Sequence, residues 1–223
     1  MKAVCVADIH GDFDSLVKLR NSILAEDFDY VILLGDYSRG FKDEKQNEAD
    51  VNMVLDILSD FNVLAIPGNC DQKSVVEIFK RRKVNLHKTL LKLPEVNIIG
   101  FGGSNVTPFN TPFEYGEDEI RENLDMLYEG VDRGVKVVVI AHAPPKDTKC
   151  DALPNGLHVG SSGLRGFIES RKPDLVLCSH IHEAAGAEDV IGETRVLNVG
   201  RISEGRAYLL EVWGEISVGL YTG

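Results

Sequence analysis

Carboxylate, amide and imidazole side chains recur directly after short apolar runs in this chain. They follow five such runs, at Asp8 and His10, at Asp36, at Asn69 and Asp71, at His142, and at His180 and His182. Imidazole and carboxylate ligands together suit divalent transition metals such as manganese, iron, cobalt, nickel or zinc. The pattern therefore predicts a metal site assembled from distant parts of the chain.

The spacing inside two of these pairs supports a shared site. Asp8 and His10 are two residues apart, as are His180 and His182, and in extended backbone such side chains point to the same side. Taken alone, a histidine after a strand or an aspartate after a glycine is usually a loop or capping residue. Together, however, the candidates outnumber the ligands that one ion needs. Two ions that share a carboxylate, about 3.5–4 Å apart, are the expected arrangement.

The elements that must position these side chains alternate between strand and helix. Strands are expected at residues 3–7, 30–34, 63–66, 96–101, 136–141 and 175–178, and helices at residues 14–24, 48–60, 74–81, 118–128 and 162–171. This alternation predicts an α/β protein with covered sheets, in which ligands bind beyond the carboxyl ends of the strands. Short runs after residue 179, at residues 190–191, 194–199, 207–212 and 216–220, predict an antiparallel meander.

Composition limits the class of protein and of partner. The chain of 223 residues is long enough for one domain with a full core, and we take residues 1–223 as that domain. A formal net charge of -11 repels nucleic acid, and the basic residues 80–83 are interpreted as a solvated helix end, which disfavours a nuclease. No apolar stretch approaches the length of a membrane span, and the four cysteines form no CxxC pair. We therefore expect a cytoplasmic protein with reduced thiols and no membrane partner, and leave a homo-oligomer open.

Five motifs carry a resemblance to a known family. "DIHGD", "GDY", "GNCD", "AHAPP" and "SHIHE" resemble, in this order, the motifs of the calcineurin-like metallophosphoesterases, and "FGGSNVTPFNTPFEYG" resembles the Icc-related predicted phosphoesterases of archaea and bacteria. The resemblance implies a four-layer α/β/β/α sandwich of two mixed sheets, with the metal site at the carboxyl edge of the strands. It also implies a ligand set: Asp8, His10 and His182 for one ion, Asn69, His142 and His180 for the other, and Asp36 as the bridge.

The implied activity is hydrolysis of a phosphate ester by two divalent ions, with manganese as the expected metal and iron, nickel, cobalt or zinc as alternatives. In this hypothesis the ions bind the ester and activate a bridging water, whose hydroxide attacks phosphorus. We favour a small organic phosphodiester as substrate. A phosphomonoesterase, including a protein phosphatase, and a non-catalytic scaffold like the retromer subunit of this fold are the alternatives.

The identity of the proton donor is open at this point. Many family members have histidine where this chain has Cys70, and a thiol is a poor acid near neutral pH. His158 is a second candidate acid, with a surface loop histidine as the alternative, and Asp71 joins Asp36, Asn69 and His142 among the catalytic candidates.

Four further residues are candidates for substrate contact. Arg39 and Arg201 could hold a phosphate, although a solvated loop residue is the favoured interpretation of each. Asn105 and Phe109 lie in the long irregular stretch 102–116, whose aromatic rings either meet the substrate or pack the loop onto the body.

Overall fold

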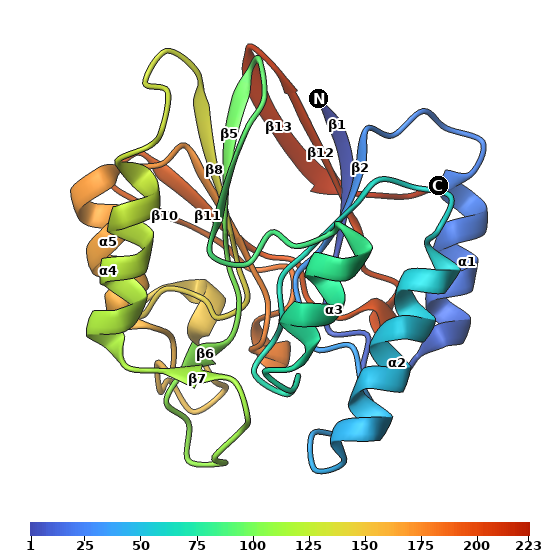
Figure 1. Ribbon diagram of the computed structural model, residues 1–223. Coiled ribbons are helices and arrows are strands. Elements are labelled where there is room, and N and C mark those ends of the chain that lie inside the picture. Colours follow the sequence, from blue (N-terminus) through green and yellow to red (C-terminus); the bar gives the residue numbers. More distant parts are fainter.

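Two mixed β-sheets face each other between two layers of helices in the computed structural model, which describes residues 1–223 (Figure 1). The first sheet has the order β13 (Glu215–Leu220), β12 (Tyr208–Trp213), β1 (Lys2–Val6), β2 (Tyr30–Leu33) and β3 (Val63–Ala65). Strands β1, β2 and β3 are parallel, and β12 and β13 are antiparallel to their neighbours.

The second sheet contains six strands. Its order is β10 (Glu188–Ile191), β11 (Thr194–Asn198), β9 (Leu175–Cys178), β8 (Lys136–Ala141), β5 (Val96–Phe101) and β4 (Thr89–Lys92). The four central strands are parallel, and the edge strands β10 and β4 are antiparallel to them. The two-residue strands β6 (Ser104–Asn105) and β7 (Glu114–Tyr115) pair with each other in the stretch that sequence marked as irregular.

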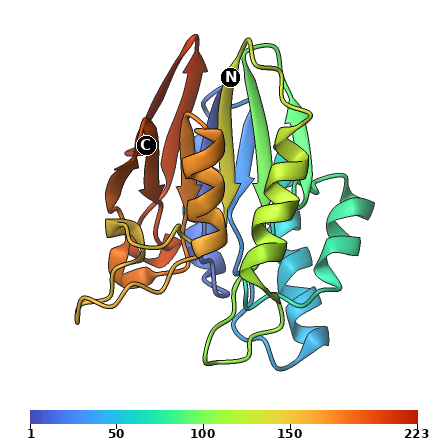
Figure 2. The same cartoon turned by 90° about the vertical axis from the view of Figure 1, so that its left-hand side faces the viewer.

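Helices cover the outer face of each sheet (Figure 2). On the first sheet lie α1 (Phe13–Ile23), α2 (Glu44–Ile57) and α3 (Val75–Arg82), and on the second lie α4 (Glu117–Tyr128) and α5 (Ser162–Arg171). Side chains cap three of these helices: Asp12, Asp43 and Ser161 each accept a backbone N–H from the first turn. Helix α2 begins at Glu44, four residues earlier than predicted. Its first turn is polar and is capped by Asp43, so the apolar spacing does not mark it.

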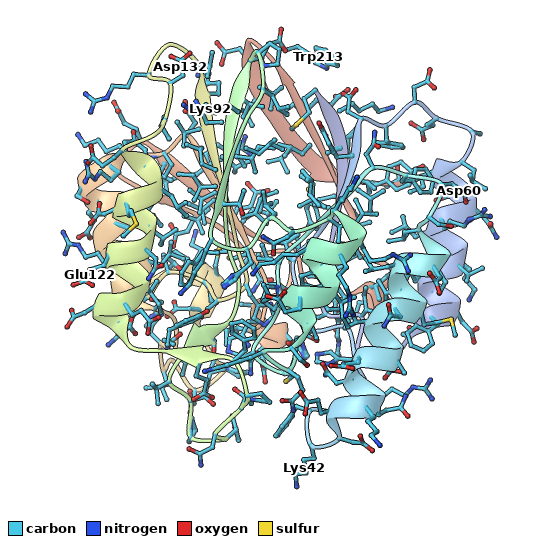
Figure 3. The ribbon with its side chains drawn as sticks, viewed as in Figure 1. Lys42, Asp60, Lys92, Glu122, Asp132 and Trp213 are labelled. Carbon is cyan, nitrogen blue, oxygen red and sulfur yellow. The ribbon has the colours of Figure 1, made fainter.

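Three apolar clusters hold the four layers together. One lies between the first sheet and its helices, one between the two sheets, and one between the second sheet and α4 and α5. Figure 3 shows side chains filling the space between the sheets, while charged residues such as Lys42, Asp60 and Glu122 project outward. The expected four-layer sandwich of two mixed sheets is confirmed.

The end of the chain is arranged differently from the prediction. The strands after residue 179 form two antiparallel hairpins in different sheets, β10–β11 in the second and β12–β13 in the first. The predicted single meander is wrong, because strand-like runs show that strands exist but not which sheet each joins. Three short 3-10 helices, η1 (Lys149–Asp151), η2 (His182–Ala184) and η3 (Ile202–Glu204), lie in the connections. No helix is both long and apolar enough to cross a membrane.

Candidate metal centre

Six of the predicted ligands form two groups at the carboxyl edge of the strands. Asp8, His10 and His182 offer ligand atoms within 4.8 Å of one another, and so do Asp36, His142 and His180. Each group combines side chains that follow strands of both sheets, β1 and β9 in the first group, and β2, β8 and β9 in the second.

Asp36, a member of the second group, also faces the first group. Its Oδ2 is 3.6 Å from Nε2 of His10 in one group and 3.6 Å from Nε2 of His142 in the other. Its other oxygen, Oδ1, accepts the backbone N–H of Cys70 at 2.9 Å, which fixes the carboxylate plane. One carboxylate oxygen therefore faces both groups, as a bridging ligand must.

Asn69 joins the second group through its amide oxygen. His142 Nδ1 donates to the carbonyl oxygen of Leu34 at 2.8 Å, so in the neutral imidazole Nε2 carries a lone pair. That Nε2 lies 3.0 Å from Asn69 Oδ1, which is also an acceptor. Two lone pairs that point at each other need a cation between them. A proton meets this need in the ion-free protein, and a divalent metal would replace it.

Two buried atoms of the first group have no hydrogen-bond partner. These are Asp8 Oδ1 and His10 Nε2, whereas Asp8 Oδ2 accepts the hydroxyl of Ser179 and the N–H of His180. Buried polar atoms are nearly always satisfied, so atoms without a partner point to a missing ligand. Carboxylate and imidazole donors placed in this way fit a divalent transition metal.

The backbone at these residues is unusual. Asp8, His10, Asp36 and His180 have φ of 48°, 45°, 57° and 69°, in the left-handed region that residues with a side chain rarely adopt. Such strain is found mainly at functional sites. It also corrects the spacing argument: Asp8 and His10 do not point to one side of an extended strand. They are aimed by tight turns, which N–H bonds from Asp8 to Gly35 and from His10 to Asp36 hold in place.

The acids and imidazoles of the ion-free site shift one another's pKa values. Burial disfavours ionisation of Asp36, but His142 and His10 outweigh burial and hold its pKa below the usual range. Burial alone would keep His142 neutral, yet the Asp36 carboxylate raises the pKa of His142 to about 9. Burial and the neighbouring His142 lower the pKa of His180 to about 3. His180 thus offers a free lone pair at neutral pH, whereas His142 must lose a proton to bind metal.

Asp71 supports the turn that carries the candidate ligands, and the neighbouring Cys70 has a weakly acidic thiol. The two oxygens of Asp71 accept the backbone N–H groups of Asp36, Tyr37 and Gly68 at 2.9, 3.1 and 2.7 Å. Burial and the charge of Asp36 raise the pKa of Asp71 to about 7. Burial also raises the pKa of the Cys70 thiol, which is then neutral and a weak nucleophile.

His158 is held by a carboxylate that the sequence argument overlooked. Its Nδ1 lies 2.7 Å from Oδ1 of Asp151, a fully buried residue that also accepts the N–H groups of Thr148 and Gly160. This hydrogen bond raises the pKa of His158. The neighbouring Val159 accepts a bond of 3.3 Å from Asn105 Nδ2, so the loops that carry the two predicted residues lie side by side.

The two candidate arginines come from segments that adjoin the first group, and each lies near a carboxylate. Arg39 Nη2 is 3.7 Å from Oδ1 of the buried Asp50. The side chain of Arg39 covers Gly11, which directly follows His10, and its guanidinium lies over the ring of Phe13. Arg201 pairs with Glu204 at 2.8 Å, and the next residue donates its N–H to Ala7, at the end of β1.

The aromatic residues of the stretch 102–116 divide into two kinds. Phe113 and Tyr115 pack against Phe101 and the buried His87, so they anchor the loop to the body. Phe109, by contrast, is 74% exposed and free to contact a substrate. The packing interpretation therefore holds for Phe113 and Tyr115, and substrate contact by Phe109 stays a prediction.

Sequence reasoning missed the residues that hold the candidate ligands and the candidate acid His158 in place. Ser179 bonds Asp8, Thr111 bonds Asn69 at 3.0 Å, and Asp151 bonds His158. Of these three, only Ser179 could have been found from the sequence, because it lies inside the SHIHE motif. Thr111 is 42 residues from its partner, and no local spacing connects the two.

Comparison with known proteins places the chain in a family. Residues 1–184 match the model of the calcineurin-like phosphoesterases. An uncharacterized protein of Methanocaldococcus jannaschii is 36% identical over 204 residues, 89% of this chain and 87% of its own length. Among solved structures, a dimetal phosphatase from Danio rerio has a TM-score of 0.74 at 11% identity, over 99% of this chain and 95% of its own. A novel archaeal phosphodiesterase has a TM-score of 0.53 at 15% identity, over 99% of this chain and 100% of its own.

At such identities the solved structures show a shared fold, which is the sandwich described above. The family model covers most of the chain, and the matched residues include all six side chains of the two groups. This chain therefore belongs to the calcineurin-like phosphoesterase family.

Proposed function

We propose that this protein is a dinuclear metal-dependent phosphodiesterase that hydrolyses a small organic phosphodiester. The observation that carries the proposal is the position of Asp36, whose one oxygen faces His10 and His142 of two separate candidate groups. Manganese is our first choice of metal. When bound, a pair of divalent ions supplies positive charge for the phosphate and an activated water as nucleophile.

The side chains of the protein would bind the ester and supply a proton. Arg39 and Arg201 would contact the phosphate by exchanging their carboxylate partners, Asp50 and Glu204, for it, in a protein whose net charge of -11 otherwise repels an anion. His158 is half-exposed, and Asp151 keeps its ring oriented and more basic, as a general acid requires. Asp71 acts as a positioning residue, because its oxygens are occupied by backbone N–H groups.

A diester fits better than a monoester because the protein exposes apolar side chains in the loop 102–116. The exposed Phe109 and Val106 offer an apolar surface for a second organic group on phosphorus.

The test compares two chromogenic substrates on the same manganese-loaded protein. We expect bis(p-nitrophenyl) phosphate to be hydrolysed faster than p-nitrophenyl phosphate, and elemental analysis to find two ions per chain. Asp36→Asn keeps an oxygen for the N–H of Cys70 but loses the charge, so it should abolish turnover with little change in the thermal stability of the ion-free protein. Preference for the monoester would make the protein a phosphomonoesterase. Failure to bind metal would favour a scaffold, and full activity of Asp36→Asn would refute the assignment.

A further inference from the structure

A chain of hydrogen bonds connects the loop 102–116 to the candidate ligand Asn69. Asn69 Nδ2 donates to Thr111 Oγ1 at 3.0 Å, and both side chains are buried. The hydroxyl of Thr111 donates in turn to Oε1 of Glu114, which also accepts the N–H of Thr111 at 2.9 Å and the hydroxyl of Thr107 at 2.6 Å. Each group therefore donates to the next, from the amide of Asn69 through the hydroxyl of Thr111 to the carboxylate of Glu114.

The charge of Glu114 fixes the direction of this chain. Burial opposes the ionised form, but the bonds from Thr107 and Thr111 outweigh burial and hold the pKa of Glu114 below its usual range. An ionised carboxylate only accepts hydrogen bonds, so the Thr111 hydroxyl must donate to it. The oxygen of Thr111 can then only accept from Asn69, which requires the NH₂ end of the amide to face Thr111.

The orientation of the amide decides whether Asn69 can bind a cation. With its NH₂ group turned to Thr111, Oδ1 lies 3.0 Å from Nε2 of His142 and faces the second group. Rotated by half a turn, the amide would present N–H donors to the cation and could not act as a ligand. We propose that Thr111 and Glu114 are positioning residues that hold the Asn69 oxygen toward the second metal ion, and this inference rests on the dinuclear site proposed above.

Backbone contacts anchor the loop independently of this chain. Phe113 donates its N–H to the carbonyl of Asn69 at 3.2 Å, and Gly103 donates to Pro67 at 2.8 Å. A variant of the Thr111 side chain therefore keeps the loop seated, and its effect can be separated from loss of the fold.

The experiment titrates manganese into metal-stripped protein by calorimetry. Thr111→Val keeps the shape of the side chain but removes the acceptor. Loss of a residue that orients a ligand typically costs 10- to 100-fold in metal affinity, so we expect the second ion to bind about 10- to 100-fold more weakly while the first binds as in the parent. Thr111→Ser restores the hydroxyl and should recover most of the second affinity.

Thr107→Val is the matched control. Thr107 donates to the same Glu114 oxygen but does not touch Asn69, so this variant should bind both ions like the parent. The inference is overturned if Thr111→Val binds two ions with parental affinities, or if Thr107→Val weakens the second ion as strongly. A parent protein that binds fewer than two ions would instead refute the dinuclear site itself.

Discussion

His158 shows how one hydrogen bond can set the chemistry of a side chain. Its partner Asp151 is buried and saturated with backbone donors, so the carboxylate cannot turn away from the imidazole. The bond of 2.7 Å favours the imidazolium form and raises the pKa of His158. A histidine held in this way can donate a proton at a higher pH than a free histidine.

This bond predicts a shift in the pH profile. A general acid is active only while protonated, so the rate falls as the pH rises through the pKa of His158. Asp151→Asn removes the charge that raises this pKa, and the basic limb of kcat/KM should move to lower pH. The measurement uses an alkyl phosphodiester, whose leaving group needs a proton.

Two comparisons control this experiment. Turnover of the bis(p-nitrophenyl) ester, whose leaving group needs little protonation, should be almost unaffected by Asp151→Asn. His158→Gln should lose the basic limb for the alkyl ester. If Asp151→Asn and the parent have the same profile on that ester, His158 is not the acid.

At the level of elements, one carboxylate connects the turns that follow two neighbouring strands. Asp71 follows β3, yet its oxygens bind the N–H groups of Asp36 and Tyr37 after β2 and of Gly68 in its own turn. Asp36 has a left-handed backbone, which needs support from its surroundings. Asp71 provides that support.

We predict that Asp71→Ala destabilises the ion-free protein strongly. The change leaves three N–H donors without an acceptor in a fully buried place, and each such donor costs about 1–3 kcal/mol. The free energy of unfolding in urea measures the loss. Asp43→Ala is the control, because that carboxylate caps α2 through one exposed bond and should cost about 1 kcal/mol. A loss for Asp71→Ala no greater than the control's would contradict this role.

At the level of the whole molecule, the sandwich itself forms the candidate site. Asp8 and Asp36 come from the first sheet, and His142, His180 and His182 come from the second. The apolar cluster between the sheets sets the distance between these side chains. An ion bound by both sheets would in turn hold the layers together.

We therefore expect metal to raise thermal stability. Ions that bind the folded but not the unfolded chain stabilise the fold. The gain is about 2.7 kcal/mol per site when the ion concentration is 100 times the dissociation constant. The melting temperature should rise with manganese and fall back with a chelator, and Asp36→Asn should show a smaller rise. Equal melting temperatures with manganese and with chelator would argue against a site shared by the sheets.

The sequence predicted most of the elements because each depends on local pattern. The helix at residues 162–171 and the strands at residues 96–101, 136–141 and 175–178 have the predicted bounds. The strand β4 was missed, since its run is short and only partly buried. The prediction that the last four strands form one meander was wrong, because the sheet that each hairpin joins depends on the packing of the whole chain rather than on local pattern.

By itself, the sequence determined the family, the layered fold and the side chains that gather at the strand ends; their role as metal ligands stays a prediction. Motif residues carry this information because the type of side chain defines its chemistry wherever it lies. Only the tertiary structure decided how these groups are held: the left-handed turns at Asp8 and Asp36, the inward carboxylate of Asp71, and the bond from Asn69 to Thr111. A hydrogen bond forms only within about 3 Å, and which distant segments come that close is fixed by the packing of the whole chain.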